Sequence, residues 1–447
     1  MKEKLSFKEL AALASMLFGM FFGAGNLIFP VHLGQMAGSN VWPAIVGFIV
    51  TGVGMPLLSV AALGISRSSG LQELSSKVSR GYGIFFTCAL YLTIGPFFAI
   101  PRCATVSFTV GIEPMLGGLS AKLALAVFTL LFFAAVLWFS LRPSGILTWI
   151  GKLLNPIFLV FLGVLTITAL VNPLAPVASV APEAGYETQA FFNGFLEGYN
   201  TMDVLAGLAF GVIVVDVIRK LGVEKPDAVA ANTVRAGVFS CLLMALIYIA
   251  VTIMGTQSRG LFATSDNGGI AFGQIAEHYF GKLGVVILAI TVTFACLKTA
   301  VGLITSCGET FSKMFPKVGG YRFWAILFCA MSCLFANVGL TAIINYAIPV
   351  LMFLYPLSIT LVLLALFGKY FGNDRRVYIS VTVLTLLAAI GDLCNTLPGG
   401  VKAALHLDSI VAIAAKLPLF SLGLGWLCPA ALGLVIGLVL HCTAKKA

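Results

Sequence analysis

Two motifs rich in glycine and asparagine interrupt apolar runs of this chain, and both have the residue types that bind a small solute through the backbone. Residues 21–30 read FFGAGNLIFP, and residues 191–203 read FFNGFLEGYNTMD. Glycine costs about 1 kcal/mol against alanine inside a helix, and proline removes a backbone donor, so each motif predicts a helix break. Backbone N–H and C=O groups that are freed at a break are available to a ligand or an ion.

The first break is expected to bind an anionic group on one side and a cation on the other. The helix that follows Asn26 begins with unpaired N–H groups and the positive end of its dipole, which suits a carboxylate. Carbonyl groups before the break, such as those of Gly19 and Phe22, suit a cation. An alternative is that the glycines only allow two helices to pack closely. The predicted substrate contacts are Gly23, Ala24, Gly25 and Asn26.

The second break is expected to form the opposite wall of the same site. Loose carbonyl groups at Gly198, Tyr199 and Asn200 would accept hydrogen bonds from an ammonium group. Tyr199 and Met202 would pack on an aliphatic side chain, although such residues in helices more often belong to the core. The two breaks together predict a site for a small zwitterion with an apolar tail.

One arginine falls inside an apolar run, where a charge is expensive. Arg102 costs roughly 2.5–3.5 kcal/mol at mid-membrane, so its side chain is expected to face the interior of the helix bundle. Its candidate partners are the carboxylates of Glu197 and Asp203, or backbone carbonyls that it would clamp. The sequence leaves a structural role and a gating role equally open.

The elements that position these residues are membrane-spanning helices. The chain has 447 residues, of which 60% are hydrophobic and 10% charged, with a mean hydropathy of +1.04. Apolar runs of about 20 residues recur, and the alternation typical of a β-barrel does not. We predict an all-α integral membrane protein with about twelve spans, at residues 7–33, 40–64, 83–111, 121–141, 146–171, 189–217, 229–255, 283–307, 322–338, 341–368, 377–397 and 418–441.

The basic residues predict the orientation of these spans. If the N-terminus is cytoplasmic, twenty Lys and Arg fall on the cytoplasmic side and five on the other. This excess follows the positive-inside rule, so both termini are predicted to be cytoplasmic. The net charge of +10 is therefore explained by basic residues on the cytoplasmic side and does not indicate a nucleic-acid partner. The ten cysteines lie almost entirely in predicted helices, without the spacing of a metal site.

The order of the spans predicts an inverted repeat within one domain, residues 1–447. The first and sixth spans are both broken, and each begins a block of five spans, 7–171 and 189–368. Because five is odd, the second block enters the membrane from the opposite side, as in many secondary transporters. The spans in 377–441 are extra. Asp392 lies there, outside both repeats, and is assigned no transport role.

Four segments of the chain carry a resemblance to a known family: 21–30, 95–108 (GPFFAIPRCATVSF), 198–203 (GYNTMD) and 295–303 (ACLKTAVGL). In these segments the chain resembles the branched-chain amino acid:cation symporter family. The resemblance covers essentially the whole chain and implies a leucine-transporter-like fold with two further helices. It also implies import of leucine, isoleucine and valine across the bacterial inner membrane, with sodium as the coupling ion. We expect no cofactor and infer no obligate protein partner.

The resemblance also implies further site residues. Tyr91 resembles a tyrosine that reaches the substrate carboxylate in this fold. A sodium site would join the carbonyls of Gly19 and Phe22 to the eighth span, where the sequence has the residues Ala295, Lys298 and Thr299. A lysine stands where a hydroxyl is expected, and an ammonium there would repel sodium. We therefore expect proton-coupled or uncoupled transport, unless Lys298 turns outward or pairs with Asp203.

Other functions are less consistent with the sequence. An intramembrane enzyme would need clustered catalytic groups, and no paired histidine motif, acidic cluster or Ser-His arrangement is present. A channel would need pore loops or rings of like charge, which are also missing. The alternative within transport is a carrier for another small solute.

Overall fold

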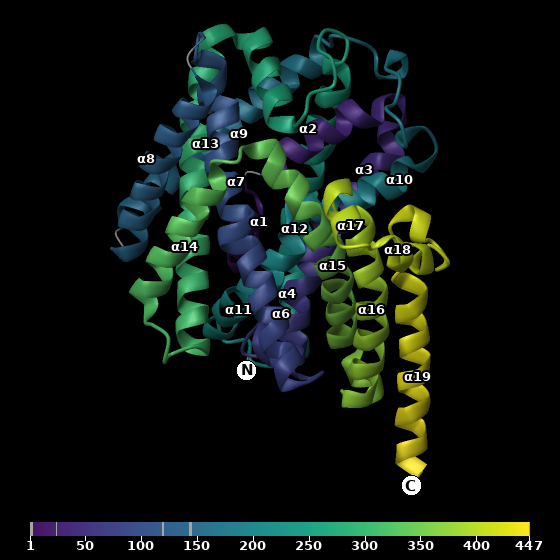
Figure 1. Ribbon diagram of the computed structural model, residues 1–447. Helices are drawn as coiled ribbons and strands as arrows, with labels where there is room; N and C mark the ends of the chain where they lie inside the picture. The colour runs from purple at the N-terminus through teal and green to yellow at the C-terminus, as the bar shows by residue number, and fades with distance from the viewer. Residues whose placement is uncertain (1–2, 24, 119, 143–144, 447) are drawn as a thin grey trace.

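The computed structural model is almost entirely helical in the part of the chain that it describes. It describes residues 3–23, 25–118, 120–142 and 145–446, with the backbone alone at 145–155 and 444–446, and these residues contain no strand. Each of the twelve predicted spans overlaps helix in the described part of the chain, although the helix of the last predicted span, α19, begins only at Leu427 (Figure 1). The all-α membrane architecture predicted from the sequence is therefore confirmed.

The first half of the chain forms spans one to five. Its α-helices are α1 (Phe7–Phe21), α2 (Gly25–Ala37), α3 (Val41–Ile49), α4 (Met55–Ser66), α5 (Leu71–Ser76), α6 (Arg80–Leu92), α7 (Ala99–Ser107), α8 (Ala121–Leu141) and α9 (Gly145–Val171). Short 3-10 or π turns join or extend them: η1 (Gly38–Asn40), η2 (Val50–Gly54), η3 (Thr93–Phe97), η4 (Phe108–Ile112), η5 (Glu113–Met115) and η6 (Val177–Ser179).

The second half forms spans six to twelve. Its α-helices are α10 (Tyr186–Glu197), α11 (Asp203–Lys220), α12 (Pro226–Ser258), α13 (Gly268–Met314), α14 (Tyr321–Ala336), α15 (Leu340–Phe367), α16 (Arg375–Thr396), α17 (Gly399–Ala404), α18 (Asp408–Ala414) and α19 (Leu427–Lys446). Its 3-10 turns are η7 (Gly198–Thr201), η8 (Gly368–Phe371) and η9 (Phe420–Leu422).

Several helical stretches, some of them made of consecutive helices, have the length and apolarity that a membrane crossing requires. Within the described residues, seven helical stretches qualify, and the bent pair Tyr186–Thr201 and Asp203–Lys220 adds an eighth. Shorter apolar helices account for the fifth, ninth and twelfth predicted spans: Pro156–Val171, Tyr321–Ala336 and Leu427–Thr443.

Both predicted helix breaks are present. α1 ends at Phe21, and α2 begins at Gly25. In the sixth span, α10 passes into η7, Met202 adopts a left-handed φ of 64°, and α11 continues after a bend of 44°. A left-handed φ is uncommon for a residue other than glycine. Contacts with the surrounding structure must therefore stabilise this conformation of Met202.

Two features differ from the prediction. The third span was expected to be one helix, but it is interrupted at Gly95, where φ is −92° and ψ is −123°, just before Pro96. Residues 256–282 were expected to form a loop, yet α13 already begins at Gly268 and turns sharply at Gly281, where φ is +58°. The segment before Gly281 contains Gln274, Glu277 and His278, so hydropathy did not mark it as a helix.

Glycines bring the first span against the seventh without intervening side chains. A Cβ on Gly34 of α2 would overlap the Thr252 carbonyl of α12, and a Cβ on Gly255 would overlap the Val31 carbonyl. The Thr256 hydroxyl then donates to the Gly34 carbonyl at 2.8 Å. Such close backbone contact is typical of membrane helices, where packing and hydrogen bonds replace the hydrophobic effect.

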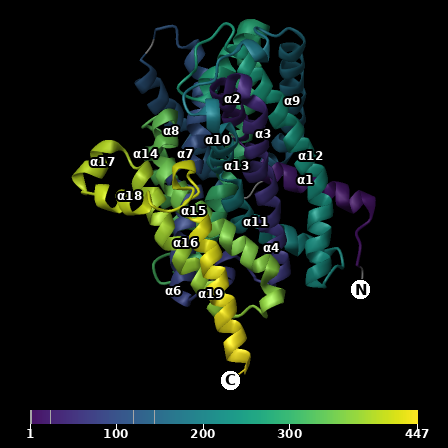
Figure 2. The same ribbon diagram turned by 90° about the vertical axis from the view of Figure 1, so that its right-hand side faces the viewer.

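Both chain termini lie at the same end of the bundle, which is the lower end of Figure 1 and is called here the termini end (Figures 1 and 2). There, Lys225 approaches Glu3 to 2.5 Å, and this contact lowers the pKa of the Glu3 carboxyl. Arg259 pairs with Glu183 at 2.9 Å. The former pair joins residues predicted to be cytoplasmic, and the latter joins residues predicted to be outside, so the predicted sides are mutually consistent.

Candidate functional site

A cavity of about 660 Å³ lies where the two helix breaks meet. Its wall comes from α1, α2, α7, α11 and α13 and from the short turns η3 and η7. From Gly25 and Asp203 at the breaks, it extends to Ser15 in α1 and Glu309 near the last turns of α13. The cavity therefore runs from the middle of the bundle towards the termini end.

The Asn26 side chain closes the first break and ties it to the second. Its Oδ1 accepts a hydrogen bond from the Gly23 N–H at 3.0 Å, which replaces a bond that a continuous helix would make. Its Nδ2 donates to Asp203 Oδ2 at 2.6 Å and to the Tyr248 hydroxyl. One amide thus joins the first, sixth and seventh spans at the cavity wall.

Arg102 holds the second break through its backbone. Its guanidinium donates to the Asn200 carbonyl at 2.5 Å and to the Thr201 carbonyl at 3.3 Å, and it lies 5.0 Å from the centre of the Phe29 ring. Among the described residues it makes no ion pair with a carboxylate. Of the two arrangements that the sequence left open, the structure has the carbonyl clamp.

The clamp changes which groups are available to a substrate. The Asn200 and Thr201 carbonyls are engaged by Arg102, whereas the predicted ammonium site required loose carbonyls. Asp203 lines the cavity beside them. Glu197 does not line the cavity and instead accepts a hydrogen bond from Asn200 Nδ2 at 3.0 Å.

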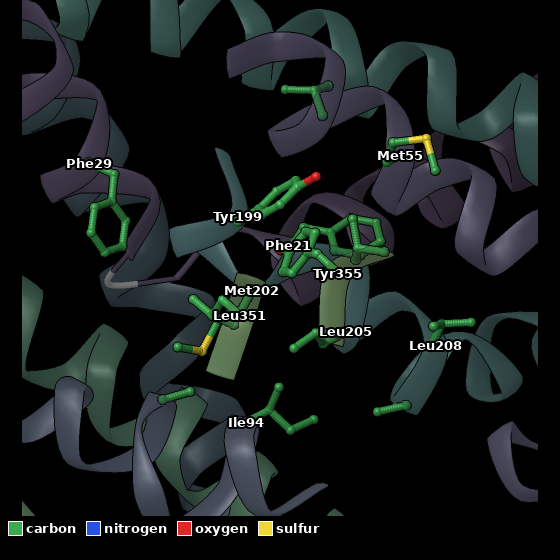
Figure 3. Packing of buried hydrophobic residues seen from close by; sticks show 14 of the residues in the cluster. Phe21, Phe29, Met55, Ile94, Tyr199, Met202, Leu205, Leu208, Leu351 and Tyr355 are labelled. Carbon is green, nitrogen blue, oxygen red and sulfur yellow. The ribbon is translucent and has the colours of Figure 1, made fainter. Parts of the chain in front are cut away.

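The predicted aromatic contacts lie behind the cavity wall. Tyr199 stacks on Tyr355 with 4.1 Å between the ring centroids and is fully buried, while Met202 lines the cavity. Figure 3 labels these three residues. Tyr91 does not line the cavity either. Its hydroxyl donates to the Ala209 carbonyl of α11 at 3.1 Å. Gly198 packs so closely that a Cβ on it would overlap the Thr51 hydroxyl.

The predicted ion-site residues are divided between the wall and its support. Gly19, Lys298 and Thr299 line the cavity, and Phe22 and Ala295 do not. Thr299 donates its hydroxyl to the Ala295 carbonyl at 3.1 Å. A Cβ on Gly23 would lie 4.0 Å from Thr299 Oγ1, so the eighth span does face the first break.

The Lys298 ammonium has no hydrogen bond or ion pair within the described part of the chain. It therefore does not pair with Asp203, which was one alternative reading of the sequence. A half-buried, unpaired ammonium on the cavity wall is free to interact with a solute. Ala24, also predicted as a substrate contact, lies outside the described residues.

Several wall residues were not singled out from the sequence. Thr201 and Phe210 line the cavity, and Tyr248 supports Asn26 from the seventh span. A tyrosine in an apolar run gives no local sign of a partner 222 residues away. Thr201 lies inside the quoted GYNTMD motif and was within reach of sequence reasoning.

Comparisons with known proteins bear on what this cavity does. The family model described as "Branched-chain amino acid transport protein" matches residues 6–444. The chain is 52% identical to the branched-chain amino acid permease BrnQ of Lactobacillus delbrueckii subsp. lactis, over 96% of each chain. It is 40% identical to BrnQ of Bacillus subtilis (strain 168), over 100% of each chain.

Solved transporters share the fold. The closed conformation of Mhp1, a nucleobase-cation-symport-1 family transporter with bromovinylhydantoin bound, superimposes with a TM-score of 0.60 at 16% identity, covering 98% of this chain and 92% of Mhp1. MhsT in complex with L-phenylalanine gives a TM-score of 0.57 at 16% identity, covering 96% of this chain and 100% of MhsT. At such identities the likeness establishes the fold alone.

Proposed function

The chain belongs to the branched-chain amino acid transport protein family, and from that premise we propose that it imports leucine, isoleucine and valine by alternating access. That it is a multi-pass membrane transporter for amino acids, and not an enzyme, follows from the family itself. The choice of substrates, the coupling ion and the direction of transport are the parts that we propose.

The observation that carries the proposal is the convergence of two helix breaks on one cavity through Asn26 and Asp203. The first turn of α2 offers its N–H groups and positive dipole end to the substrate carboxylate. Asp203, rather than a loose carbonyl, is the acceptor for the ammonium. Binding therefore uses charges of opposite sign on the two broken spans.

The apolar part of the wall suits a branched aliphatic side chain. Met20, Ile94 and Phe210 line the cavity and present hydrocarbon surface. Burial of such surface stabilises a ligand by about 25 cal/mol per Å² of apolar area. A leucine side chain gains from this wall, whereas a polar side chain would lose its hydration without a partner.

We further propose that sodium does not occupy the site between the first break and Thr299. Lys298 places an unpaired ammonium on the same wall, and like charges repel strongly where water is scarce. Transport is then coupled to protons or uncoupled. Sodium remains the ion that the family resemblance implies, so the ion must be tested directly.

The test is uptake of labelled leucine by purified protein in proteoliposomes, with and without sodium. We expect saturable uptake that does not require sodium. In Lys298→Thr, which restores a hydroxyl beside Thr299, sodium should stimulate uptake about tenfold, the effect of 1.4 kcal/mol. Lys313→Thr, near the end of the same helix, is the matched control and should behave like the parent. A parent that requires millimolar sodium would refute the assignment to Lys298, and absence of leucine uptake would refute the proposed substrate.

A further inference from the structure

One polar side chain holds the start of the first span against the seventh span. Asn232 of α12 is fully buried, and its amide bonds to the short non-helical segment before α1. Its Oδ1 accepts from the Leu5 N–H at 3.1 Å, and its Nδ2 donates to the Glu3 carbonyl at 2.9 Å and to the Ala228 carbonyl of its own helix at 2.8 Å. We call the two bonds to Leu5 and Glu3 the Asn232 clamp.

The Asn232 clamp acts on α1 because the clamped segment is tied to that helix. Ser6 is the N-cap of α1, and its hydroxyl accepts from the Glu9 N–H at 3.4 Å. The Ser6 N–H donates in return to the Glu9 carboxylate at 2.8 Å, which completes a capping box. Further along, the Ser240 hydroxyl of α12 donates to the Ala14 carbonyl, so α1 is fixed to α12 at two places (Figure 2).

Another face of α1 borders the part of the cavity near the termini end. Ser15 and Gly19 line the cavity from α1, and Gly302 and Glu309 line it from α13. These four residues are exposed, whereas Asp203 at the second break is buried. The cavity therefore reaches solvent between α1 and α13, and we call this opening the mouth.

Two glycines border the mouth without a packing reason in this conformation. Nothing lies within 4 Å of a Cβ on Gly19 or on Gly302, although glycine is unfavourable inside a helix. Nearer to the break the gap narrows, since a Cβ on Gly23 would lie 3.9 Å from the Thr299 methyl group. Bare backbone at Gly19 and Gly302 is what α1 and α13 need to meet closely in a conformation with a closed mouth.

We propose that Asn232 is a positioning residue of transport, and that its clamp holds α1 on α12 and thereby keeps the mouth open. The clamp must release before the mouth can close. This inference rests on the proposed alternating access, in which the two ends of the cavity open in turn. α1 is suited to this movement because it ends at Phe21, and the break before Gly25 separates it from α2.

The clamp is strong enough to bias the mouth and weak enough to release. One hydrogen bond shifts an equilibrium by roughly two- to tenfold, because water replaces it when it breaks. Water can reach this segment, since the Glu3 side chain is exposed. The ion pair of Glu3 with Lys225 is exposed on both sides, so it contributes little beside the buried amide.

The experiment measures the ratio of open to closed mouth directly. Nitroxide labels are attached to Lys8→Cys on α1 and Lys313→Cys on α13, both exposed positions, in protein whose exposed Cys428 and Cys442 are serine. Pulsed electron paramagnetic resonance then gives the distances between the labels and the population of each distance, without leucine. We expect a longer distance for the open mouth and a shorter one for the closed mouth.

Three variants should change this ratio in stated directions. Asn232→Ala should lower the open-to-closed ratio by about tenfold, because two hydrogen bonds specific to the open state are lost. Ser240→Ala removes the single bond to α1 and should lower the ratio by about threefold. Gly302→Ala adds a methyl group that has room only while the mouth is open, so the ratio should rise at least about fivefold.

The matched control is Arg235→Ala, which removes an exposed side chain from α12 one turn after Asn232 and should leave the ratio unchanged. A lower thermal midpoint of Asn232→Ala with an unchanged ratio would make Asn232 a structural residue and overturn the proposal. A higher ratio in Asn232→Ala, or a lower one in Gly302→Ala, would overturn it as well.

The distance measurement needs no transport, so the two proposals can fail separately. A parent that takes up no leucine would refute the proposed function, while the distances still test the clamp. A parent that takes up leucine but shows one distance, which neither leucine nor any of these variants changes, would refute the movement of α1 and leave the leucine carrier intact.

Discussion

At the scale of single residues, Arg102 shows how one charged side chain can stabilise a break in a membrane-spanning helix. Its guanidinium satisfies two carbonyls that η7 leaves without helical partners, and the Phe29 ring covers it from the first span. Its burial at 5% exposure requires such partners. The side chain therefore joins the third span to both broken spans.

Removal of this side chain should disable transport. Arg102→Ala leaves two buried carbonyls unsatisfied and loses hydrogen bonds worth about 1.5–3 kcal/mol each, because the donor is charged. We expect leucine uptake to fall at least about tenfold and the thermal midpoint in detergent to drop. Arg102→Lys should recover part of the loss, since lysine supplies a charge without the planar fork.

The matched control for this change is Arg142→Ala. Arg142 lies 4.2 Å from the Trp138 ring on an exposed surface, where a charge contributes little. Uptake by this variant should equal that of the parent. Wild-type uptake and thermal midpoint in Arg102→Ala would show that the clamp is dispensable.

The sequence predicted which residues belong to the site better than it predicted the contacts that those residues make. The motif around Asn26 predicted a break, but not that its own amide would close the break and hold Asp203, 177 residues away. Arg102 was predicted to face the interior of the bundle, but its hydrogen-bond partner could not be chosen between carboxylates and backbone carbonyls. Tyr91 was placed by resemblance, and its hydroxyl bonds to α11 behind the cavity wall. Long-range partners depend on tertiary packing, which no local pattern encodes.

At the scale of elements, glycine and proline predicted where helices stop, and hydropathy predicted where they run. The two breaks in the first and sixth spans were found in this way, because they combine several unfavourable residues. The interruption at Gly95 was missed although Pro96 follows this glycine directly, because the segment still reads as apolar and π turns preserve most hydrogen bonds. The helix at Gly268 was missed because it precedes the apolar stretch of α13.

The sixth-span break should tolerate no added methyl group at its start. A Cβ on Gly198 would overlap the hydroxyl of Thr51, which donates to the Phe195 carbonyl at 2.6 Å. We expect Gly198→Ala to destabilise the protein by about 1–3 kcal/mol, as overpacking does, and to reduce uptake. Thermal melting in detergent and uptake in proteoliposomes measure both effects.

Two further variants make this result specific. Gly163→Ala adds a methyl group in α9 where nothing lies within 4 Å, and it should leave melting and uptake unchanged or slightly improved. Thr51→Ala combined with Gly198→Ala should recover part of the stability, because the overlapping oxygen is gone. Equal melting of Gly198→Ala and the parent would contradict the crowding.

At the scale of the whole molecule, different polar contacts stabilise the two ends of the bundle. The termini end carries the Lys225–Glu3 pair and a 3.2 Å hydrogen bond between Lys77 and Asn373. The opposite end carries the Arg259–Glu183 pair. The cavity extends towards the termini end, so the predicted orientation would place this end of the cavity on the cytoplasmic side.

Cysteine labelling in intact cells tests this orientation. In a background with the exposed Cys428 and Cys442 replaced by serine, we place single cysteines at the exposed positions Asp266 and Lys369. A membrane-impermeant maleimide should react with Asp266→Cys at least about tenfold faster than with Lys369→Cys, because basic loops stay in the cytoplasm. Cell lysis should equalise the rates, and the reverse preference in intact cells would invert the topology.

The glycine contacts between α2 and α12 also have a genetic consequence. Every missense change at the Gly34 or Gly255 codon introduces a side chain, and even the smallest would overlap a backbone carbonyl of the neighbouring helix. Exposed positions such as Leu242 and Leu246 can exchange one apolar residue for another. Random mutagenesis should therefore leave these two codons almost unchanged among functional survivors, while the outer face of the same helix drifts freely.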